Sequence, residues 1–352
     1  MGNETWGLQI SLDRFAEGQK FFMAKPKIAI IGLGVIGASL GLGLQREPGN
    51  FEIVGHDKDA DNTQRARKLN AVQRTEWNLH NACDGAELIL LTLSLSELAE
   101  TLPHIREDVK PETLIFAVTN IMQPAIDIAA KHLAPETHFV VGHPILTGIG
   151  APLAARVDLF NEVTFGIAPG RNTDPSAVQL ASDFVERLGA KPLFVDPQEH
   201  DGIIANVEHL PQMLAALLMR LSADSAGWRE ARRLAGRVFA QSTELDATAS
   251  ELFGALQNNR ANLLQRIDQL QNELVHWRGL LEAEGAPDTK HPLLATLEQV
   301  VEQREQWEAQ AYLKRWDDSA PTTTPPAETG GMFRQMFFGN RKGRKSDSTQ
   351  QK

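Results

Sequence analysis

Short apolar runs alternate with helical patterns along the first half of the chain. Between Lys27 and about Val195, each run is followed by a segment whose apolar positions recur at helical spacing. This rhythm is typical of a parallel sheet that helices cover on both faces. The pattern therefore predicts an α/β, doubly wound domain over residues 26–195. The predicted strands are Ile28–Ile31, Ile53–Val54, Leu88–Leu93, Leu114–Val118, Phe139–Val141, Val163–Ala168 and Leu193–Val195.

The alternation stops at the segment VDPQEHD. Asp196 can cap a helix and Pro197 suits the first helical position, and the pattern beyond them is helical throughout. We expect an all-α domain over residues 196–317. The apolar residues of this domain form long seams along its helices. Seams of this kind usually bury against other helices, which predicts a homodimer formed through this domain. One long amphipathic helix is marked by Leu252, Leu256, Leu263, Ile267, Leu270, Leu274, Trp277 and Leu281.

The two ends of the chain differ in composition from the middle. Residues 1–25 are predicted to be an N-terminal extension, with charged residues where a secretory signal has its apolar core. Residues 318–352 are rich in Pro, Thr, Gly and basic residues, which predicts a disordered basic tail. Its cluster FRQMFFGNRKGRK could touch an acidic surface or a membrane. A solubilising tail without a partner is the alternative.

The segment KIAIIGLGVIGASLGLGL has two opposed interpretations. Its apolar length comes close to that of a membrane helix. Its glycines, however, follow the pattern G-x-G-x-x-G between a strand and a helix, which is how a dinucleotide site is built. Gly32 permits a tight turn, Gly34 lets the backbone approach a pyrophosphate, and Gly37 allows close packing. We expect a Rossmann-type domain, with a glycine-rich packing turn as the alternative. The candidate cofactor-binding residues are Gly32, Leu33, Gly34, Val35, Ile36 and Gly37.

An acidic residue follows the second predicted strand. Asp57 lies 20 residues beyond Gly37, where a carboxylate can accept hydrogen bonds from the ribose hydroxyls of the cofactor. A carboxylate there repels a 2′-phosphate, so NAD is favoured over NADP. Lys58 and Arg65 are close enough to soften this preference, although both could be ordinary solvated charges.

Composition narrows the classes of function. The chain has 352 residues and a formal net charge of −10, which gives no broad attraction to nucleic acid. Its one cysteine, Cys83, excludes intramolecular disulfides and multi-cysteine metal sites, and we expect no metal. Apart from KIAIIGLGVIGASLGLGL, no segment looks long and apolar enough to span a membrane, so we expect a cytoplasmic protein. We also expect a small-molecule substrate.

The segment VVGHPILTG holds the best candidate for chemistry. His143 follows an apolar strand and would face the nicotinamide from the carboxyl edge of the sheet, near the boundary of the two domains. A histidine there can accept a proton from a substrate hydroxyl while a hydride leaves the same carbon. For an isolated histidine beside a proline, a structural role is the alternative.

The chain resembles the prephenate/arogenate dehydrogenase family from Lys27 to Trp316. The likeness rests on the order and spacing of IIGLGVIGASL, GHP, DLFNEVTFGIAPGRNTDPSAVQLASDFVERLGA, DPQEHD, HLPQMLAALL and NNRANLLQRIDQL. The resemblance implies a dimeric enzyme that takes a hydride from the ring carbinol of prephenate or arogenate, with loss of the ring carboxylate as CO2. It also implies that His143 hydrogen-bonds the ring hydroxyl and that the helical domain supplies groups for the substrate carboxylates.

Several positions depart from the pattern of this family. Where the family usually carries Asp, Ser and Lys after the fourth strand, this chain has Ala117, Asn120 and Met122. Asn120 could still hydrogen-bond in place of the serine. In EHLPQ, Glu208 and Gln212 replace a serine and a histidine, while His209 remains.

Two arginines of the family are also replaced, by Ala240 and Glu244. Losing a bidentate arginine and adding a carboxylate both weaken the binding of a dianionic substrate. A basic stripe just upstream could replace them as a carboxylate clamp, or it could be a solvated helix face. Its members are Arg229, Arg232, Arg233 and Arg237. The candidate catalytic residues are thus His143 and Asn120, and the candidate substrate-binding residues are His209, Gln212, Arg233 and Arg237.

Three functions remain open from the sequence. The first is an NAD-dependent dehydrogenase acting on prephenate or arogenate. The second is a paralogue that oxidises another, less anionic hydroxy compound, because cations are lost while His143 is kept. The third is a non-catalytic NAD-binding dimer that acts as a sensor or scaffold.

Overall fold

The computed structural model describes residues 25–46, 51–146, 153–245, 247–284, 289–313 and 316. The predicted N-terminal extension, apart from Lys25, and the predicted basic tail lie outside these residues. The chain divides into two compact units, Met1–Gln299 and Val300–Lys352. The sheet, the glycine turn and His143 all belong to the first unit.

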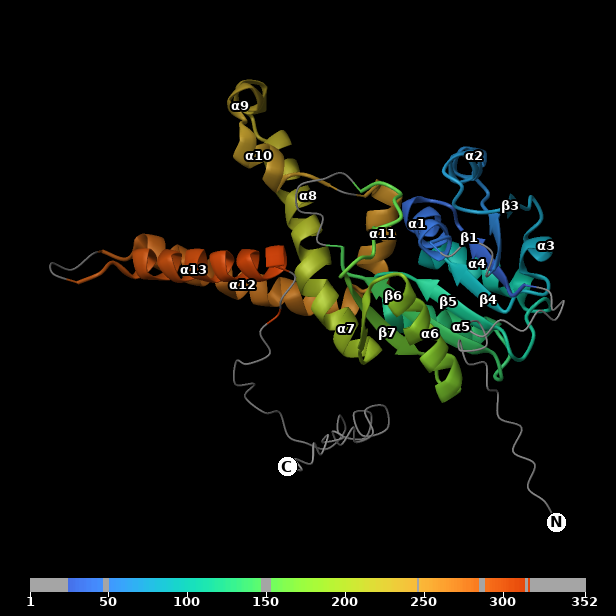
Figure 1. The fold of residues 1–352 in the computed structure, drawn as a ribbon. Helices are drawn as coiled ribbons and strands as arrows, with labels where there is room; N and C mark the ends of the chain where they lie inside the picture. Colours follow the sequence, from blue (N-terminus) through green and yellow to red (C-terminus); the bar gives the residue numbers. More distant parts are fainter. Residues whose placement is uncertain are drawn as a thin grey trace, which may run out of the picture. The chain divides into compact units, whose positions relative to one another are not determined.

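An eight-stranded sheet forms the amino-terminal part, in the order β3-β2-β1-β4-β5-β6-β7-β8 (Figure 1). The seven predicted strands are all present, and the short β3 was not predicted. The strands are β1 (Lys27–Ile31), β2 (Glu52–His56), β3 (Arg74–Thr75), β4 (Leu88–Leu91), β5 (Leu114–Val118), β6 (His138–Pro144), β7 (Thr164–Pro169) and β8 (Lys191–Phe194).

The sequence analysis expected a parallel sheet, but the observed sheet is parallel only in part. Strands β1 to β6 pair in parallel, but β7 runs antiparallel to β6, with His143 opposite Gly166, and β8 is parallel to β7. A parallel neighbour requires a crossover connection, usually a helix. The described residues between β6 and β7 contain no helix, so the chain returns in the opposite direction.

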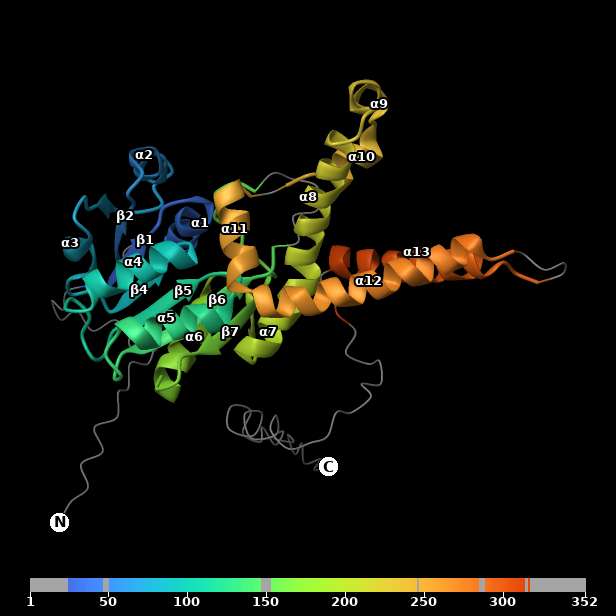
Figure 2. The same cartoon turned by 180° about the vertical axis from the view of Figure 1, so that it is seen from behind.

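Helices cover both faces of the sheet, which confirms the doubly wound fold (Figures 1 and 2). Side chains alternate along β1, so Ile28 and Ile30 join the core under α1 and α6, while Ala29 and Ile31 join the core under α3, α4 and α5. These near-continuous apolar strands are buried on both sides, as expected where helices lie on each face. The helices are α1 (Val35–Leu44), α2 (Ala60–Lys68), α3 (Leu79–Cys83), α4 (Leu95–Ile105), α5 (Met122–His132) and α6 (Pro175–Arg187).

The carboxyl-terminal part is helical, as predicted. Its first helix begins where expected, because the Asp196 side chain accepts hydrogen bonds from the amides of Gln198 and Glu199 and Pro197 occupies the first turn. The elements are α7 (Pro197–Ile204), a π-helical turn (Ala205–His209), α8 (Leu210–Ala223), α9 (Trp228–Leu234), α10 (Arg237–Ser242), α11 (Ala249–Asn258), α12 (Arg260–Glu282) and α13 (Pro292–Leu313).

Two helices expected to be continuous are interrupted. The long amphipathic helix is divided into α11 and α12 at Asn259, a buried polar residue whose side chain bonds elsewhere in the fold. The basic stripe is divided between α9 and α10 at Ala235 and Gly236, which both have an extended backbone. The prediction that its four arginines share one helix is therefore wrong.

The helical run Pro197–Ala223 is long and apolar enough to cross a membrane by length and composition, with a mean hydropathy of 1.2 over its best window. The sequence analysis expected no such segment; this helix meets the criteria by length and composition only, and a membrane span is not evident from it. One such helix is weak evidence, because helices that pack on protein satisfy the same criteria. The face that it leaves exposed includes Leu217, Leu218 and Leu221.

Candidate functional site

The glycine turn links β1 to α1 in the way that its spacing predicts. Gly32 has a φ of +94°, and a Cβ there would overlap with Thr92, so only glycine fits. A Cβ on Gly37 would overlap with the carbonyl oxygen of Gly32, which shows how closely α1 packs on the turn. Gly34, by contrast, has nothing within 4 Å of a Cβ position, so its surface is open.

The amino-terminal end of α1 can receive an anion. Gly34 is the N-cap residue and offers no side chain to the first amides of α1, which begins at Val35. Unpaired amides and the helix dipole attract negative charge at such an end. Together with the open surface over Gly34, this arrangement fits the pyrophosphate of a dinucleotide.

Asp57 follows β2 and reaches the turn. Its Oδ2 accepts hydrogen bonds from the amide of Leu33 at 2.6 Å and from Asn62 Nδ2 at 3.2 Å. The structure therefore brings the predicted carboxylate and the predicted glycine turn together. Of the two nearby cations, Lys58 pairs with Glu100 at 3.3 Å and Arg65 contacts Asn62.

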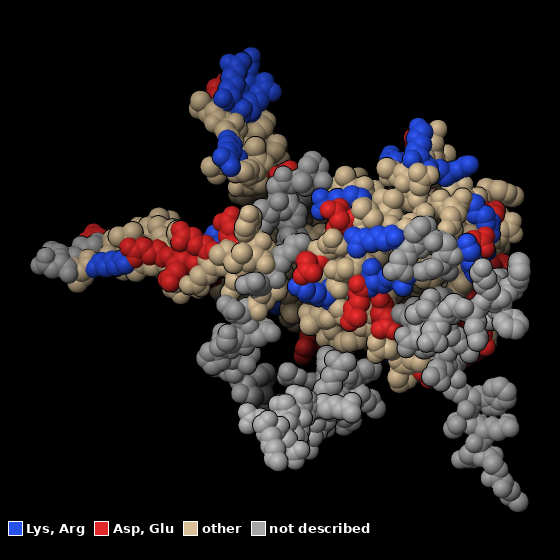
Figure 3. All heavy atoms as spheres, viewed as in Figure 1, with Lys and Arg blue, Asp and Glu red and all other residues tan. Residues whose placement is uncertain are grey.

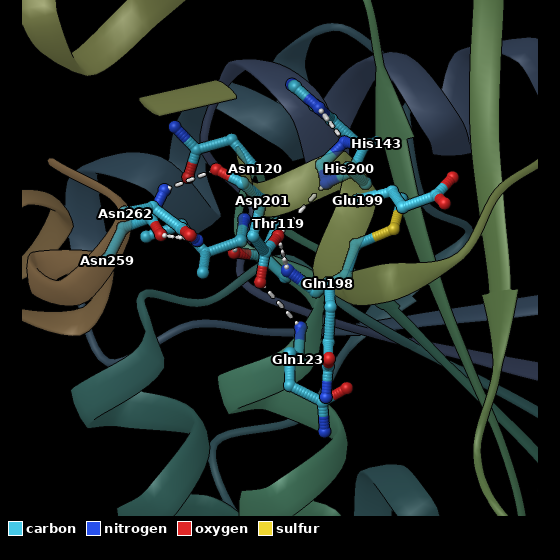
Figure 4. Close-up of polar contacts among 12 residues, drawn as sticks. Thr119, Asn120, Gln123, His143, Gln198, Glu199, His200, Asp201, Asn259 and Asn262 are labelled. Atoms are coloured by element: carbon cyan, nitrogen blue, oxygen red, sulfur yellow. Dashed lines mark hydrogen bonds and ion pairs between the residues drawn. The ribbon is translucent and has the colours of Figure 1, made fainter. Parts of the chain in front are cut away.

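A second cluster surrounds His143, which is buried near the end of β6 (Figure 4). Its Nδ1 lies 3.0 Å from Nε2 of His200, and Nδ1 of His200 lies 3.0 Å from Oδ1 of Asp201. Asp201 also accepts the amides of Met122 at 2.7 Å and Gln123 at 2.9 Å. The carboxylate thus sits at the amino-terminal end of α5, where the helix dipole favours a negative charge.

This chain of contacts assigns the tautomers of both histidines. Asp201 accepts from Nδ1 of His200, and in the neutral form of that ring Nε2 of His200 carries a lone pair. His143 must then donate from Nδ1, which leaves Nε2 of His143 with its own lone pair. The pKa of His143 falls from 6.5 to about 3, because burial and then the neighbouring His200 and His209 disfavour its charge. His143 is therefore a neutral acceptor at physiological pH.

Glu208 faces the acceptor atom of His143. Its Oε1 lies 3.5 Å from His143 Nε2, and its Oε2 accepts a hydrogen bond of 2.9 Å from Asn120 Nδ2. Burial raises the pKa of Glu208, while the bond from Asn120 and the nearby His200 act in the opposite direction. Asn120 and Glu208, which the sequence analysis singled out as departures from the family pattern, therefore meet at His143.

The π-helical turn places His209 beside this cluster. His209 is buried, and its Nδ1 lies 3.2 Å from Asn259 Nδ2, which also donates to the backbone oxygen of Asp201 at 2.7 Å. Within the described part of the chain, Nε2 of His209 and Oε1 of Gln212 are buried and have no hydrogen-bond partner. Since buried polar atoms are normally paired, these two atoms are exceptions that a bound ligand or water could satisfy. Single π-helical turns occur often at functional sites.

Arg233 and Arg237 are not brought to this cluster. Both are exposed, on α9 and α10 respectively, and Figure 3 shows Lys and Arg side chains gathered there. Among the described contacts, neither arginine pairs with a residue around His143. Nor do the described residues contain a group of three or more His, Cys, Asp or Glu that could hold a metal ion.

The sequence analysis did not assign roles to His200, Asp201 and Asn259. The first two lie in the segment DPQEHD, which was noted as a helix start at the domain boundary and for its likeness to a family. A histidine and an aspartate together just inside a helix that starts at the domain boundary were the available signal. Asn259 gave no signal, because an asparagine between helical leucines looks like an exposed position.

Two family descriptions match most of the chain. "Prephenate dehydrogenase, nucleotide-binding domain" matches residues 40–193, and "Prephenate dehydrogenase, dimerization domain" matches residues 196–299. The first match begins after the glycine turn, so the assignment of the turn rests on its own geometry.

Curated relatives and solved structures agree with this result. Prephenate dehydrogenase of Bacillus subtilis (strain 168) is 26% identical over 272 residues, which are 74% of this chain and 72% of that protein. The enzyme of Lactococcus lactis subsp. cremoris (strain MG1363) is 27% identical over 253 residues, 70% of this chain and 69% of that protein.

The structure of A. aeolicus prephenate dehydrogenase with hydroxyphenyl propionate and NAD+ has a TM-score of 0.71 at 18% identity, covering 82% of this chain and all of that one. Synechocystis arogenate dehydrogenase has a TM-score of 0.64 at 23% identity, covering 80% and 99%. At these identities the structures show a shared fold. The two family matches, which together cover most of the chain, show that this chain belongs to the prephenate dehydrogenase family.

Proposed function

We propose that this protein is an NAD-dependent dehydrogenase that oxidises and decarboxylates prephenate or arogenate. The observation that carries the proposal is the neutral His143, whose Nε2 is left as an acceptor by the contacts with His200 and Asp201. The family match supports the reaction class. The buried chain of hydrogen bonds also favours catalysis over the non-catalytic sensor considered from the sequence.

The glycine turn is the proposed cofactor site. The open surface at Gly34 and the free amides at the start of α1 would hold the pyrophosphate, and Asp57 would accept hydrogen bonds from the ribose. NAD is preferred over NADP because the Asp57 carboxylate would repel a 2′-phosphate. When bound, the nicotinamide supplies the acceptor for the hydride.

His143 takes the proton of the ring hydroxyl as the hydride leaves the same carbon. The bond from the ring to its carboxylate then breaks, CO2 leaves, and the electron pair makes the ring aromatic. The phenolate oxygen produced in this way takes the proton back from His143. Asp201 and His200 hold the imidazole in the tautomer that makes this transfer possible.

The polar atoms left unpaired near His143 are the proposed substrate contacts. His209 Nε2 and Gln212 Oε1 would hydrogen-bond the substrate, and Asn120 would act through Glu208. The clamp proposed for Arg233 and Arg237 would require these exposed residues to approach the site. The Glu208 carboxylate lies beside His143, while Arg233 and Arg237 are exposed. Both features disfavour a dianionic substrate, and they support the second candidate, a paralogue that oxidises a less anionic hydroxy compound.

The helical domain is the proposed dimer interface. It matches a dimerization domain, and α8 exposes Leu217, Leu218 and Leu221 in the single chain. Large apolar side chains clustered on a surface mark sites of association. The cytoplasmic location expected from the sequence remains a prediction.

An NADH-absorbance assay with prephenate and arogenate tests the function. We expect NAD-dependent turnover of at least one substrate, and a loss of at least about 100-fold in His143→Ala, since general base catalysis contributes that much. His104→Ala, an exposed histidine at the end of α4, is the matched control and should keep full activity. If neither substrate reduces NAD, hydroxy acids without a second carboxylate should be screened to test the paralogue.

A further inference from the structure

Glu208 lies next to the ring nitrogen of His143 that would accept the proton of a substrate hydroxyl. Its Oε1 is 3.5 Å from Nε2, the atom that the tautomer argument leaves with a free lone pair. Asn120 binds the other oxygen of the carboxyl group and so directs Oε1 at the imidazole. The resemblance described from the sequence implies a serine at this position in the family, so the carboxyl group is a departure of this chain from that pattern.

His143 by itself is a poor place to put a proton. It is buried, its Nδ1 is already bonded to His200, and burial together with His200 and His209 disfavours its charged form. The buried anion Asp201 lies behind His200 and is bonded to two backbone amides. The reaction nevertheless requires His143 to hold a proton while the hydride leaves. An anion at Nε2 would lower the free energy of that state.

We propose that Glu208 is a second catalytic residue, whose carboxylate shares with His143 Nε2 the proton that leaves the substrate hydroxyl. The inference rests on the proposed function and adds a partner to its base. The O–H bond of the substrate breaks, and the proton is held between Nε2 and Oε1 while the hydride goes to NAD. After CO2 has left, the same proton returns to the phenolate oxygen, so the enzyme ends each turnover unchanged.

The pair makes activity depend on the ionisation of Glu208. The ionisable groups around it are His143 on β6, His200 on α7 and His209 beside it in the π-helical turn. Burial raises the pKa of the Glu208 carboxyl. As the pH falls through that pKa, the carboxyl binds a proton and can no longer accept one, so the rate falls.

Two substitutions separate catalysis from mere occupation of the site. Glu208→Gln keeps the shape but removes the negative charge, and Glu208→Ser restores the residue usual in the family. We expect both to lower kcat by at least about tenfold with little change in KM, and to remove the acidic limb of the kcat profile. Glu199→Gln, an exposed glutamate on α7, is the control and should behave as wild type. Wild-type kcat or an unchanged acidic limb in both variants would overturn the proposal.

A titration without substrate distinguishes failure of this inference from failure of the proposed function. We would follow the ring nitrogens of His143 by NMR from about pH 8 to about pH 4, the range in which carboxyl and imidazole groups titrate. If the proton is shared, the His143 signal moves in the wild type as Glu208 titrates and stays fixed over that step in Glu208→Gln. Identical curves in the two proteins would exclude sharing, whatever substrate the enzyme uses.

Discussion

Gly34 differs from the other two glycines of the turn in what surrounds it. Gly32 and Gly37 are required by the fold, because a Cβ on either would overlap with backbone or side-chain atoms, whereas the space over Gly34 is open. A methyl group at Gly34 therefore leaves the folded protein intact but stands where the pyrophosphate must approach.

Gly34→Ala should weaken NAD binding by at least about tenfold while the melting temperature stays within about 2 °C of the wild type. Calorimetric titration with NAD and a thermal melt measure the two effects. Gly254→Ala, inside α11 with equally open surroundings, is the control: it should leave NAD binding unchanged and should not lower the melting temperature, because alanine favours a helix more than glycine does. Normal NAD affinity in Gly34→Ala would place the diphosphate elsewhere.

The carboxylate of Asp57 is expected to make the protein prefer NAD over NADP. Asp57→Asn keeps an oxygen for the Leu33 amide but removes the charge and one strong acceptor for the ribose. NAD binding should weaken by about 1–3 kcal/mol and NADP binding by less, because a repulsion disappears at the same time. Asp59→Asn is the matched control, since asparagine also caps α2. Equal losses for both cofactors would contradict the role given to Asp57.

The lowered pKa of His143 links folding to pH. The unfolded chain binds a proton near pH 6.5 and the folded protein only near pH 3, so the free energy of unfolding falls as the pH drops below about 6.5. Between pH 7 and pH 5 this contribution is about 2 kcal/mol. Urea denaturation at both pH values should show a smaller pH effect in His143→Gln than in the wild type. The exposed His104→Gln should retain the wild-type difference, and an unchanged pH effect in His143→Gln would show that His143 binds its proton equally well in both states.

At the scale of residues, the sequence predicted those whose spacing along the chain fixes their chemistry. The glycine turn and Asp57 belong to one β-α-β unit, so short distances in sequence were enough. His143 and His200 are separated by 57 positions, and only the packing of α7 beside α5 and β6 brings their rings together. The contact between Glu208 and His143 was hidden for the same reason.

At the scale of elements, Asn259 at the start of α12 helps to tie this helix to α7. Asn259 Nδ2 donates to the backbone oxygen of Asp201 and lies beside His209 Nδ1, and its own Oδ1 accepts from Asn262. These bonds require the side chain to turn inwards at the break between α11 and α12. The helix break therefore supports the shape of the site.

Asn259→Ala should destabilise the protein by about 2–3 kcal/mol, because it leaves buried polar groups of α7 and the π-helical turn without partners. Asn258→Ala, one position earlier and exposed, loses only a bond to Gly254 within its own helix and should cost less than about 1 kcal/mol. Urea denaturation of both variants at one protein concentration measures the difference. Similar losses would mean that Asn259 only fills space.

Apolar runs predicted the strands, but not how each strand is directed. Val163–Ala168 has the composition of a buried strand in either direction, and the antiparallel pairing of β7 with β6 could not be read from it. Likewise, the leucines on both sides of Asn259 keep a helical spacing across the break. Periodicity shows which residues face the core, but a single buried hydrogen bond decides where a helix ends.

At the scale of the whole molecule, the helical domain leaves an apolar face on α8 without a partner in the single chain. Leu218 and Leu221 are 44% and 63% exposed. The same helix carries Gln212 and follows the π-helical turn with His209, so association through α8 would also hold the site in place. A second copy of the chain is the occupant that the dimerization-domain match supports.

A double substitution, Leu218→Glu with Leu221→Glu, should convert the proposed dimer into monomers, because each buried charge opposes association by several kcal/mol. Light scattering after size-exclusion chromatography should show twice the chain mass for the wild type and one chain mass for the variant. Leu69→Glu, an exposed leucine at the end of α2, is the control and should remain dimeric. If the wild type is monomeric and pellets with lipid vesicles, the apolar face binds a membrane instead, and the helical run Pro197–Ala223 must be reinterpreted.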